Sequence, residues 1–126
     1  MSVELNHTII AAKDKRESAE FLAHVLGLEV GEAWGPFIPV STANGVTLDF
    51  ATVPDGNVSP QHYAFLVSEA EFDVAFERIR EAGLTYWADP RKERPMEINH
   101  NDGGRGVYFP DPSGHYMEII TRPYGG

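Results

Sequence analysis

The chain contains no cysteine, and basic residues are scarce. Among 126 residues there are 10 Lys and Arg against 19 Asp and Glu, which gives a formal net charge of -9. Without cysteine, disulfides, iron–sulfur clusters and thiolate zinc sites are excluded, so a metal would need His, Asp, Glu or backbone oxygen as ligands. The acidic balance disfavours a phosphate-binding surface, and we expect neither nucleic acid nor an anionic membrane as a partner.

Long apolar runs are also missing. The first 20 residues carry several charges and no extended apolar core, which argues against a signal peptide or a membrane span. The length suits one compact domain over residues 1–126. These properties predict a cytoplasmic protein.

Residues 105–121 read as strand, tight turn and strand. The run 107–109 is rich in strand formers, while Pro110, Pro112 and Gly114 interrupt it. The second strand, 116–121, is mostly apolar but holds Glu118 in its middle. A buried carboxylate is costly unless it is paired or binds a metal, so Glu118 needs a partner.

The rest of the chain divides into short elements. The pattern predicts helices over 15–26 and between Ser68 and Gly83, each opened by a capping-box spacing. A polar loop is expected over 89–103. Strands are expected near 3–10, 28–34, 36–42, 45–53, 61–67 and 84–88.

These elements form an internal repeat of order strand, helix, strand, strand, strand. Module one covers about 1–55 and module two about 57–126. Gly45–Thr52 aligns without gaps to Gly114–Thr121, which places Asp49 on Glu118, and His7 matches His62 on the first strands. A repeat this short cannot bury its own sheet face. We therefore predict an α+β fold in which two βαβββ modules pair into a cupped, barrel-like mixed sheet with the helices outside.

Pairing of the repeats would bring two histidines and two carboxylates into one cup. A single inward histidine would more simply be a core residue, but the repeat favours a metal site with His7, His62 and Glu118 as ligands. Imidazole and carboxylate suit Fe(II), Mn(II), Co(II), Ni(II) or Zn(II) and leave positions open for substrate or water. Asp49 is a fourth ligand, a catalytic base, or an acceptor for a neighbouring donor.

Further polar residues near the second carboxylate are candidates for substrate contact. His100, Asn101, Arg105 and Tyr108 fit this role, with His100 and Tyr108 also candidates for catalysis. The alternative is that the loop is merely solvated and Tyr108 belongs to the core. His115 alternates with Glu118 onto the other face of the strand and is not expected to be a ligand.

The paired βαβββ modules with His7, His62 and Glu118 resemble the vicinal oxygen chelate superfamily, which includes glyoxalase I, extradiol dioxygenases, fosfomycin-resistance thiol transferases, methylmalonyl-CoA epimerase and bleomycin-resistance proteins. The resemblance covers essentially the whole chain. It implies a divalent metal that chelates two adjacent substrate oxygens as a Lewis acid. It also implies a homodimer, in which His7 could meet His62 and Glu118 of a second subunit.

The resemblance leaves three functions open. Glyoxalase-like isomerase or lyase chemistry on a small molecule with neighbouring oxygens is the leading expectation, with Asp49 available as a base. The stretch from Ile98–His100 through Tyr108 to Glu118 resembles the signature of extradiol ring-cleaving dioxygenases. The strand where those enzymes carry an acid/base histidine has Thr47, Asp49 and Ala51 here. The third function is a non-catalytic small-molecule or antibiotic binder.

Overall fold

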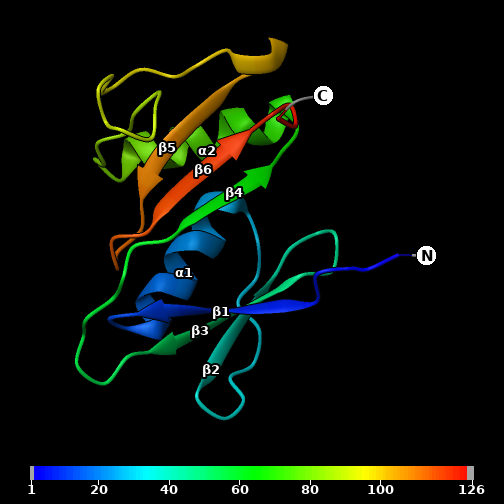
Figure 1. The fold of residues 1–126 in the computed structure, drawn as a ribbon, viewed down its shortest axis with the longest axis vertical. Coiled ribbons are helices and arrows are strands. Elements are labelled where there is room, and N and C mark those ends of the chain that lie inside the picture. Colours follow the sequence, from blue (N-terminus) through cyan, green and yellow to red (C-terminus); the bar gives the residue numbers. More distant parts are fainter. Residues whose placement is uncertain (1, 125–126) are drawn as a thin grey trace. The chain divides into compact units, whose positions relative to one another are not determined.

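The computed structural model describes residues 2–124. The chain forms two compact units, Met1–Ser59 and Pro60–Gly126. Each unit contains one α-helix and one three-stranded mixed sheet (Figure 1). The predicted α+β class is therefore confirmed, whereas the pairing of the modules into one cup stays a prediction. No helix within residues 2–124 has the length and apolar character needed to cross a membrane.

Unit 1 follows the order strand, helix, strand, strand. Its sheet has β1 parallel to β3 and β2 antiparallel to β3. The Asp14 side chain caps the helix by accepting from two backbone N–H groups, and Gly27 ends it in the left-handed conformation with φ 70°. The elements are β1 (His7–Ala12), α1 (Lys15–Leu26), β2 (Phe37–Ser41) and β3 (Thr47–Thr52).

Unit 2 repeats this plan. In its sheet, β4 is parallel to β6 and β5 is antiparallel to β6. Ser68 and Glu71 form the predicted capping box, with both reciprocal hydrogen bonds present. The elements are β4 (His62–Leu66), α2 (Glu69–Glu81), the short 3-10 helix Asn101–Gly103, β5 (Gly106–Pro110) and β6 (Tyr116–Ile120).

Side chains alternate between the two faces of each sheet. One face is directed to the helix of its unit, and we call the other the helix-free face. In β1, Ile10 and Ala12 are buried, while His7 and Ile9 are exposed. In β4 the exposed residues are His62, Ala64 and Leu66. Both repeat-equivalent histidines therefore lie on the helix-free face of their own sheet.

The strand predicted after each helix is reduced to single bridges. In 28–34, Val30 pairs with Val40 and Trp34 with Phe37, and in 84–88 only Trp87 pairs. In unit 1 the cause lies in the partner strand, because Pro39 of β2 has no N–H to donate to a ladder. The first strand is also shorter than expected, since it begins at His7 rather than at residue 3.

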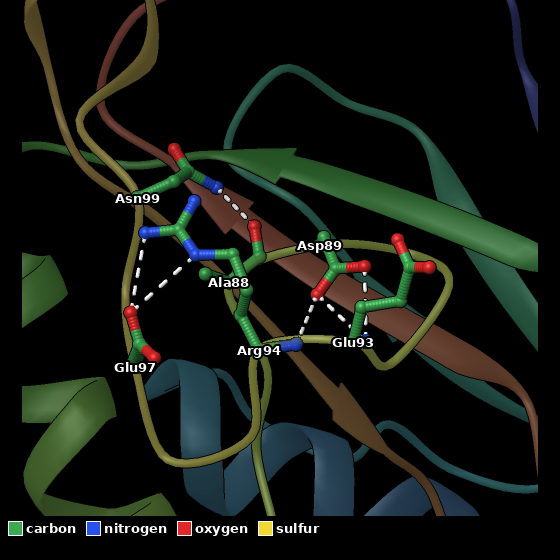
Figure 2. Close-up of polar contacts among 6 residues, drawn as sticks. All are labelled: Ala88, Asp89, Glu93, Arg94, Glu97 and Asn99. Atoms are coloured by element: carbon green, nitrogen blue, oxygen red, sulfur yellow. Dashed lines mark hydrogen bonds and ion pairs between the residues drawn. The ribbon is translucent and has the colours of Figure 1, made fainter.

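The polar loop 89–103 is folded onto itself (Figure 2). The Asp89 carboxylate accepts from the backbone N–H groups of Glu93 at 3.0 Å and Arg94 at 2.8 Å. The Asn99 amide nitrogen donates to the Ala88 carbonyl at 2.8 Å and so ties the two ends of the loop together. The same turn contains an Arg94–Glu97 ion pair at 3.2 Å. The loop is thus a fixed edge of the unit 2 sheet.

Removal of the Ser68 hydroxyl tests the local origin of α2. In Ser68→Ala the Glu71 N–H loses its acceptor, which lies at 3.1 Å, and we expect the free energy of unfolding to fall by about 1 kcal/mol. Urea denaturation followed by circular dichroism measures the change. Ser59→Ala, an exposed serine outside any helix, is the matched control. An equal loss in both variants would contradict the capping argument.

Candidate functional site

Strand register in unit 2 collects three predicted site residues on the helix-free face. Ala64 of β4 and Tyr108 of β5 both pair with Glu118 of β6, on its two sides. His62 lies two residues before Ala64 and so shares its face. The structure thereby brings His62, Tyr108 and Glu118 together from three neighbouring strands.

Glu118 is held by hydrogen bonds to both of its oxygens. The His62 Nε2–H donates to Oε1 at 2.8 Å, and the Tyr124 hydroxyl donates to Oε2. The carboxylate is only 1% exposed, whereas the His62 side chain is 43% exposed. The buried charge therefore has the partners it requires, and one of them faces solvent.

Two phenols extend this cluster. The Tyr108 and Tyr124 oxygens lie 3.2 Å apart, and Tyr108 is the donor because Tyr124 gives its single proton to Glu118. Burial, followed by the hydrogen bonds to Glu118 and Tyr108, raises the pKa of Tyr124 well above its usual value. Burial, with a smaller contribution from the Glu118 charge, also raises the pKa of Tyr108. Both hydroxyls therefore keep their protons at neutral pH.

The turn before β6 fixes where β4 begins. The buried His115 ring accepts a hydrogen bond at Nδ1 from the Gln61 backbone N–H at 2.9 Å, directly before His62. The Asp111 carboxylate accepts from the N–H groups of Ser113 and His115, at 3.0 and 2.8 Å. Burial raises the pKa of Asp111 despite these hydrogen bonds. His115 thus supports the position of His62 from the other side of the sheet.

Aromatic rings surround the cluster on the same face. Trp87 exchanges backbone hydrogen bonds with Tyr108, at 2.9 and 2.8 Å, so the two side chains lie on one side of the sheet. The Lys92 ammonium lies 4.8 Å from the ring centroids of both Trp87 and Tyr116. Tyr116 pairs with His62 in the ladder. The face therefore offers flat apolar surfaces and one cation.

Unit 1 carries the matching histidine and carboxylate. His7 is exposed, and its Nδ1–H donates to the Asn6 side-chain oxygen at 2.7 Å, which leaves Nε2 with a free lone pair. Asp49 shares the helix-free face, is 4% exposed, and lies beside Ile9 and Pro39 in the ladders. Its Oδ1 has no hydrogen-bond partner among residues 2–124. Such an oxygen remains available to a metal or a proton donor.

Two predicted substrate residues lie elsewhere in unit 2. Arg105 forms ion pairs with Glu69 at 2.8 Å and Asp73 at 2.9 Å, and its guanidinium carbon lies 4.3 Å from the Phe72 ring centroid. Its side chain is therefore directed to α2, on the opposite face from Glu118. His100 is exposed at the start of the 3-10 helix. Within residues 2–124, no hydrogen bond or ion pair joins Arg105 or His100 to the cluster.

The His62–Glu118 pair fits part of a divalent metal site. Two ligand atoms each about 2.1 Å from one ion at a right angle are about 3 Å apart, and Nε2 and Oε1 are separated by 2.8 Å. Within the described part of unit 2 no third histidine or carboxylate joins them. The free Nε2 of His7 is a chemically suitable third donor. The donor types thus fit the ion, but they are distributed over both units.

The chain belongs to the glyoxalase/bleomycin resistance protein/dioxygenase superfamily, whose family model matches residues 4–119. Its fold and sequence are similar to those of a solved structure named oxidase ChaP-H2, with 67% identity and a TM-score of 0.97 over 100% of this chain and 98% of that one. Oxidase ChaP-H1 is 60% identical with a TM-score of 0.95, over 99% and 100% of the two chains.

A more distant relative has a different named activity. The chain is 30% identical to glutathione transferase FosA of Serratia marcescens over 124 residues, which cover 94% of this chain and 81% of that protein. The superfamily resemblance inferred from the repeat is therefore confirmed. The specific reaction is a separate question, because relatives in this family carry out different chemistry.

Sequence reasoning missed two residues that contact the predicted ligands. Tyr124 lies beyond the last strand, and no periodicity marks it, although a tyrosine six residues after a buried glutamate was a visible signal. Asn6 directly precedes His7, and alternation along an extended strand would place the two side chains on opposite faces. The contacts of both residues can be recognised only from the positions of their side chains.

A double-mutant cycle tests the His62–Glu118 contact. In protein kept in EDTA we expect His62→Ala and Glu118→Gln to be coupled by about 1 kcal/mol in the free energy of unfolding. The coupling is modest because His62 is 43% exposed and solvent screens the pair. Urea denaturation of the four proteins measures it. Additive effects of the two substitutions would show that the pair contributes no interaction energy.

Proposed function

We propose that this chain is a divalent-metal-dependent enzyme that oxidises a small molecule bearing two adjacent oxygens with dioxygen. The observation that carries the proposal is the convergence of His62 Nε2 and Glu118 Oε1, at 2.8 Å, beside the Tyr108 phenol. The similarity to two proteins named as oxidases favours oxygen chemistry over the proton transfer expected from sequence. A catechol-type aromatic is the substrate class that suits the surrounding rings.

The proposed ligands are His7, His62 and Glu118. Two histidines and one carboxylate form a facial triad that is typical of non-haem Fe(II) oxygenases, although Mn, Co, Ni or Zn also suit these donors. The bound ion would supply Lewis-acid binding of the two substrate oxygens and, with iron, electrons for dioxygen. Asn6 would orient His7, since its oxygen accepts from Nδ1–H and leaves Nε2 free.

The remaining residues of the cluster have roles in binding and proton handling. Tyr108 gives its proton to Tyr124 and presents its oxygen near the His62 ring, whose centroid lies 5.5 Å from that of the Tyr108 ring, so it can accept a hydrogen bond from a substrate hydroxyl. Trp87 and Tyr116 would stack on a planar ring, and the Lys92 ammonium would stabilise a substrate that binds as an anion.

Proton transfer next to a carbonyl is the second candidate function. It is favoured by Asp49, whose buried Oδ1 has no hydrogen-bond partner within residues 2–124 and could accept a proton. Under the oxidative proposal the same carboxylate takes the proton of the substrate hydroxyl. The two functions therefore share Asp49 and differ in whether dioxygen is consumed.

The proposed assembly is a homodimer in which His7 of one protomer meets His62 and Glu118 of its partner. Support comes from β1 and the residues just before it, where apolar side chains on both sides of His7 are exposed: Leu5 by 67% and Ile9 by 56%. β1 is also an edge strand of its sheet. Exposed apolar edges of this kind are typical of surfaces that another chain covers.

Oxygen consumption distinguishes the candidate functions. Protein loaded anaerobically with Fe(II) and given a catechol panel should take up one dioxygen per substrate, with both atoms entering the cleaved ring product. His62→Ala should lose more than about 100-fold in rate. His24→Ala, an exposed histidine on α1, should keep the wild-type rate and serves as the matched control.

The other results of this experiment each identify an alternative. Metal-loaded protein that converts hemithioacetals with Ni(II), Co(II) or Zn(II) and consumes no oxygen would replace oxidation by proton transfer. Stoichiometric ligand binding without turnover of either panel would indicate a binding protein. Wild type that retains no metal after reconstitution would contradict the proposal altogether.

Subunit mixing tests the shared site. Protomers carrying His7→Ala should each have a defective site, and so should protomers carrying Glu118→Ala. If ligands come from both chains, a mixture of the two variants should regain one intact site per heterodimer. Random exchange of equal amounts makes about half of the dimers heterodimers, so about one quarter of the wild-type activity is expected at full exchange. The measurement is the initial rate after mixing, with subunit exchange verified by mass spectrometry of differently tagged chains. Confirmed exchange without rescue would locate the site within one chain.

A further inference from the structure

The two oxygens of Glu118 have different partners. Oε1 accepts from His62, the proposed neighbouring ligand, and Oε2 accepts from Tyr124. Glu118 is buried in the middle of β6, so it cannot exchange these contacts for water. The side chain is thereby fixed with one oxygen beside the His62 nitrogen and the other occupied by a phenol.

The direction of the hydrogen bonds reinforces this arrangement. A carboxylate only accepts, so the Tyr124 proton lies toward Oε2, and Tyr108 donates to the Tyr124 oxygen at 3.2 Å. Tyr124 is thus anchored on both sides although the residue as a whole is 55% exposed. Its hydroxyl is positioned by two groups of the same site.

The backbone before Tyr124 is also fixed. Thr121 accepts at Oγ1 from the Arg105 N–H at 2.8 Å, and its own N–H donates to the Arg105 carbonyl at 2.9 Å. A Cβ atom at Gly104 would lie 2.5 Å from Thr121 Oγ1 and 2.6 Å from Arg122 Cγ, so the chain packs where only glycine leaves room. The segment that carries Tyr124 therefore leaves β6 in a defined direction.

We propose that Tyr124 is a positioning residue that keeps Glu118 a one-oxygen ligand. The inference rests on the proposed metal function. With two histidines and one carboxylate oxygen bound, an octahedral ion retains three open positions, enough for two substrate oxygens and dioxygen. A carboxylate that bound through both oxygens would occupy one of those positions. By holding Oε2, Tyr124 preserves the position that the oxidant needs.

The same contact could instead compete with the metal. In that case Tyr124 would have to leave before an ion could bind. The geometry favours positioning, because Tyr124 contacts Oε2 and leaves Oε1 beside His62 Nε2. The two readings predict opposite changes in metal affinity when the hydroxyl is removed.

Tyr124→Phe tests the proposal in the full-length protein. Ligand-orienting hydrogen bonds contribute about 10- to 100-fold to metal affinity, so we expect Co(II) and anaerobic Fe(II) to bind at least about 10-fold more weakly, measured by isothermal titration. The visible spectrum of the Co(II) protein should change as the second oxygen of Glu118 takes a position that solvent holds in the wild-type protein. Tyr63→Phe is the matched control, because Tyr63 follows His62 but contacts His115 on the other face. It should leave both measurements unchanged.

The remaining outcomes separate failure of this inference from failure of the proposed function. Tighter metal binding by Tyr124→Phe would show competition and overturn the positioning role. Unchanged affinity together with an unchanged Co(II) spectrum would overturn it as well, while wild-type binding that depends on His62 would leave the proposed function intact. Wild type that binds neither ion would overturn the proposed function, and this inference with it.

Discussion

A carboxylate buried in an apolar strand is the constraint on which unit 2 depends. Glu118 has Met117 and Ile119 as buried neighbours in β6, and an ion there without partners would destabilise the sheet. The strands around it therefore place a histidine on one oxygen and a tyrosine on the other. The residues that stabilise the buried charge are the same ones that form the candidate site.

The arrangement depends on the register of the three strands more than on their length. Each paired strand of unit 2 has only five residues, and the contacts that fix their alignment lie outside the cluster. His115 holds the start of β4 through Gln61, and the loop closed by Asn99 holds Trp87 against Tyr108. A shift by one residue would move His62 or Glu118 to the helix side. The loop and the turn thus act on the site through the backbone.

The sequence marked only part of the candidate site, and metal binding by its residues stays a prediction. Histidines and carboxylates at repeat-equivalent positions pointed to His62 and Glu118, because side-chain alternation fixes the face once the strand is recognised. The predicted strands over 28–34 and 84–88 were wrong in extent, since each is reduced to single bridges. For 28–34 the reason lies in the partner strand, because Pro39 of β2 has no N–H to donate. Tyr124 and Asn6 escaped prediction because a single side-chain contact has no period in the sequence.

Each half of the proposed ligand set is oriented within its own unit. Asn6 fixes the proton of His7 on Nδ1, and Tyr124 fixes Oε2 of Glu118, so one nitrogen and one oxygen are already selected before any metal binds. Ordering of side chains is a large part of the free-energy cost of forming a site from separate segments. When that ordering is complete in each unit, the remaining cost is that of bringing His7 to His62 and Glu118. In the proposed dimer, burial of Leu5 and Ile9, the exposed apolar residues on both sides of His7, would offset this cost.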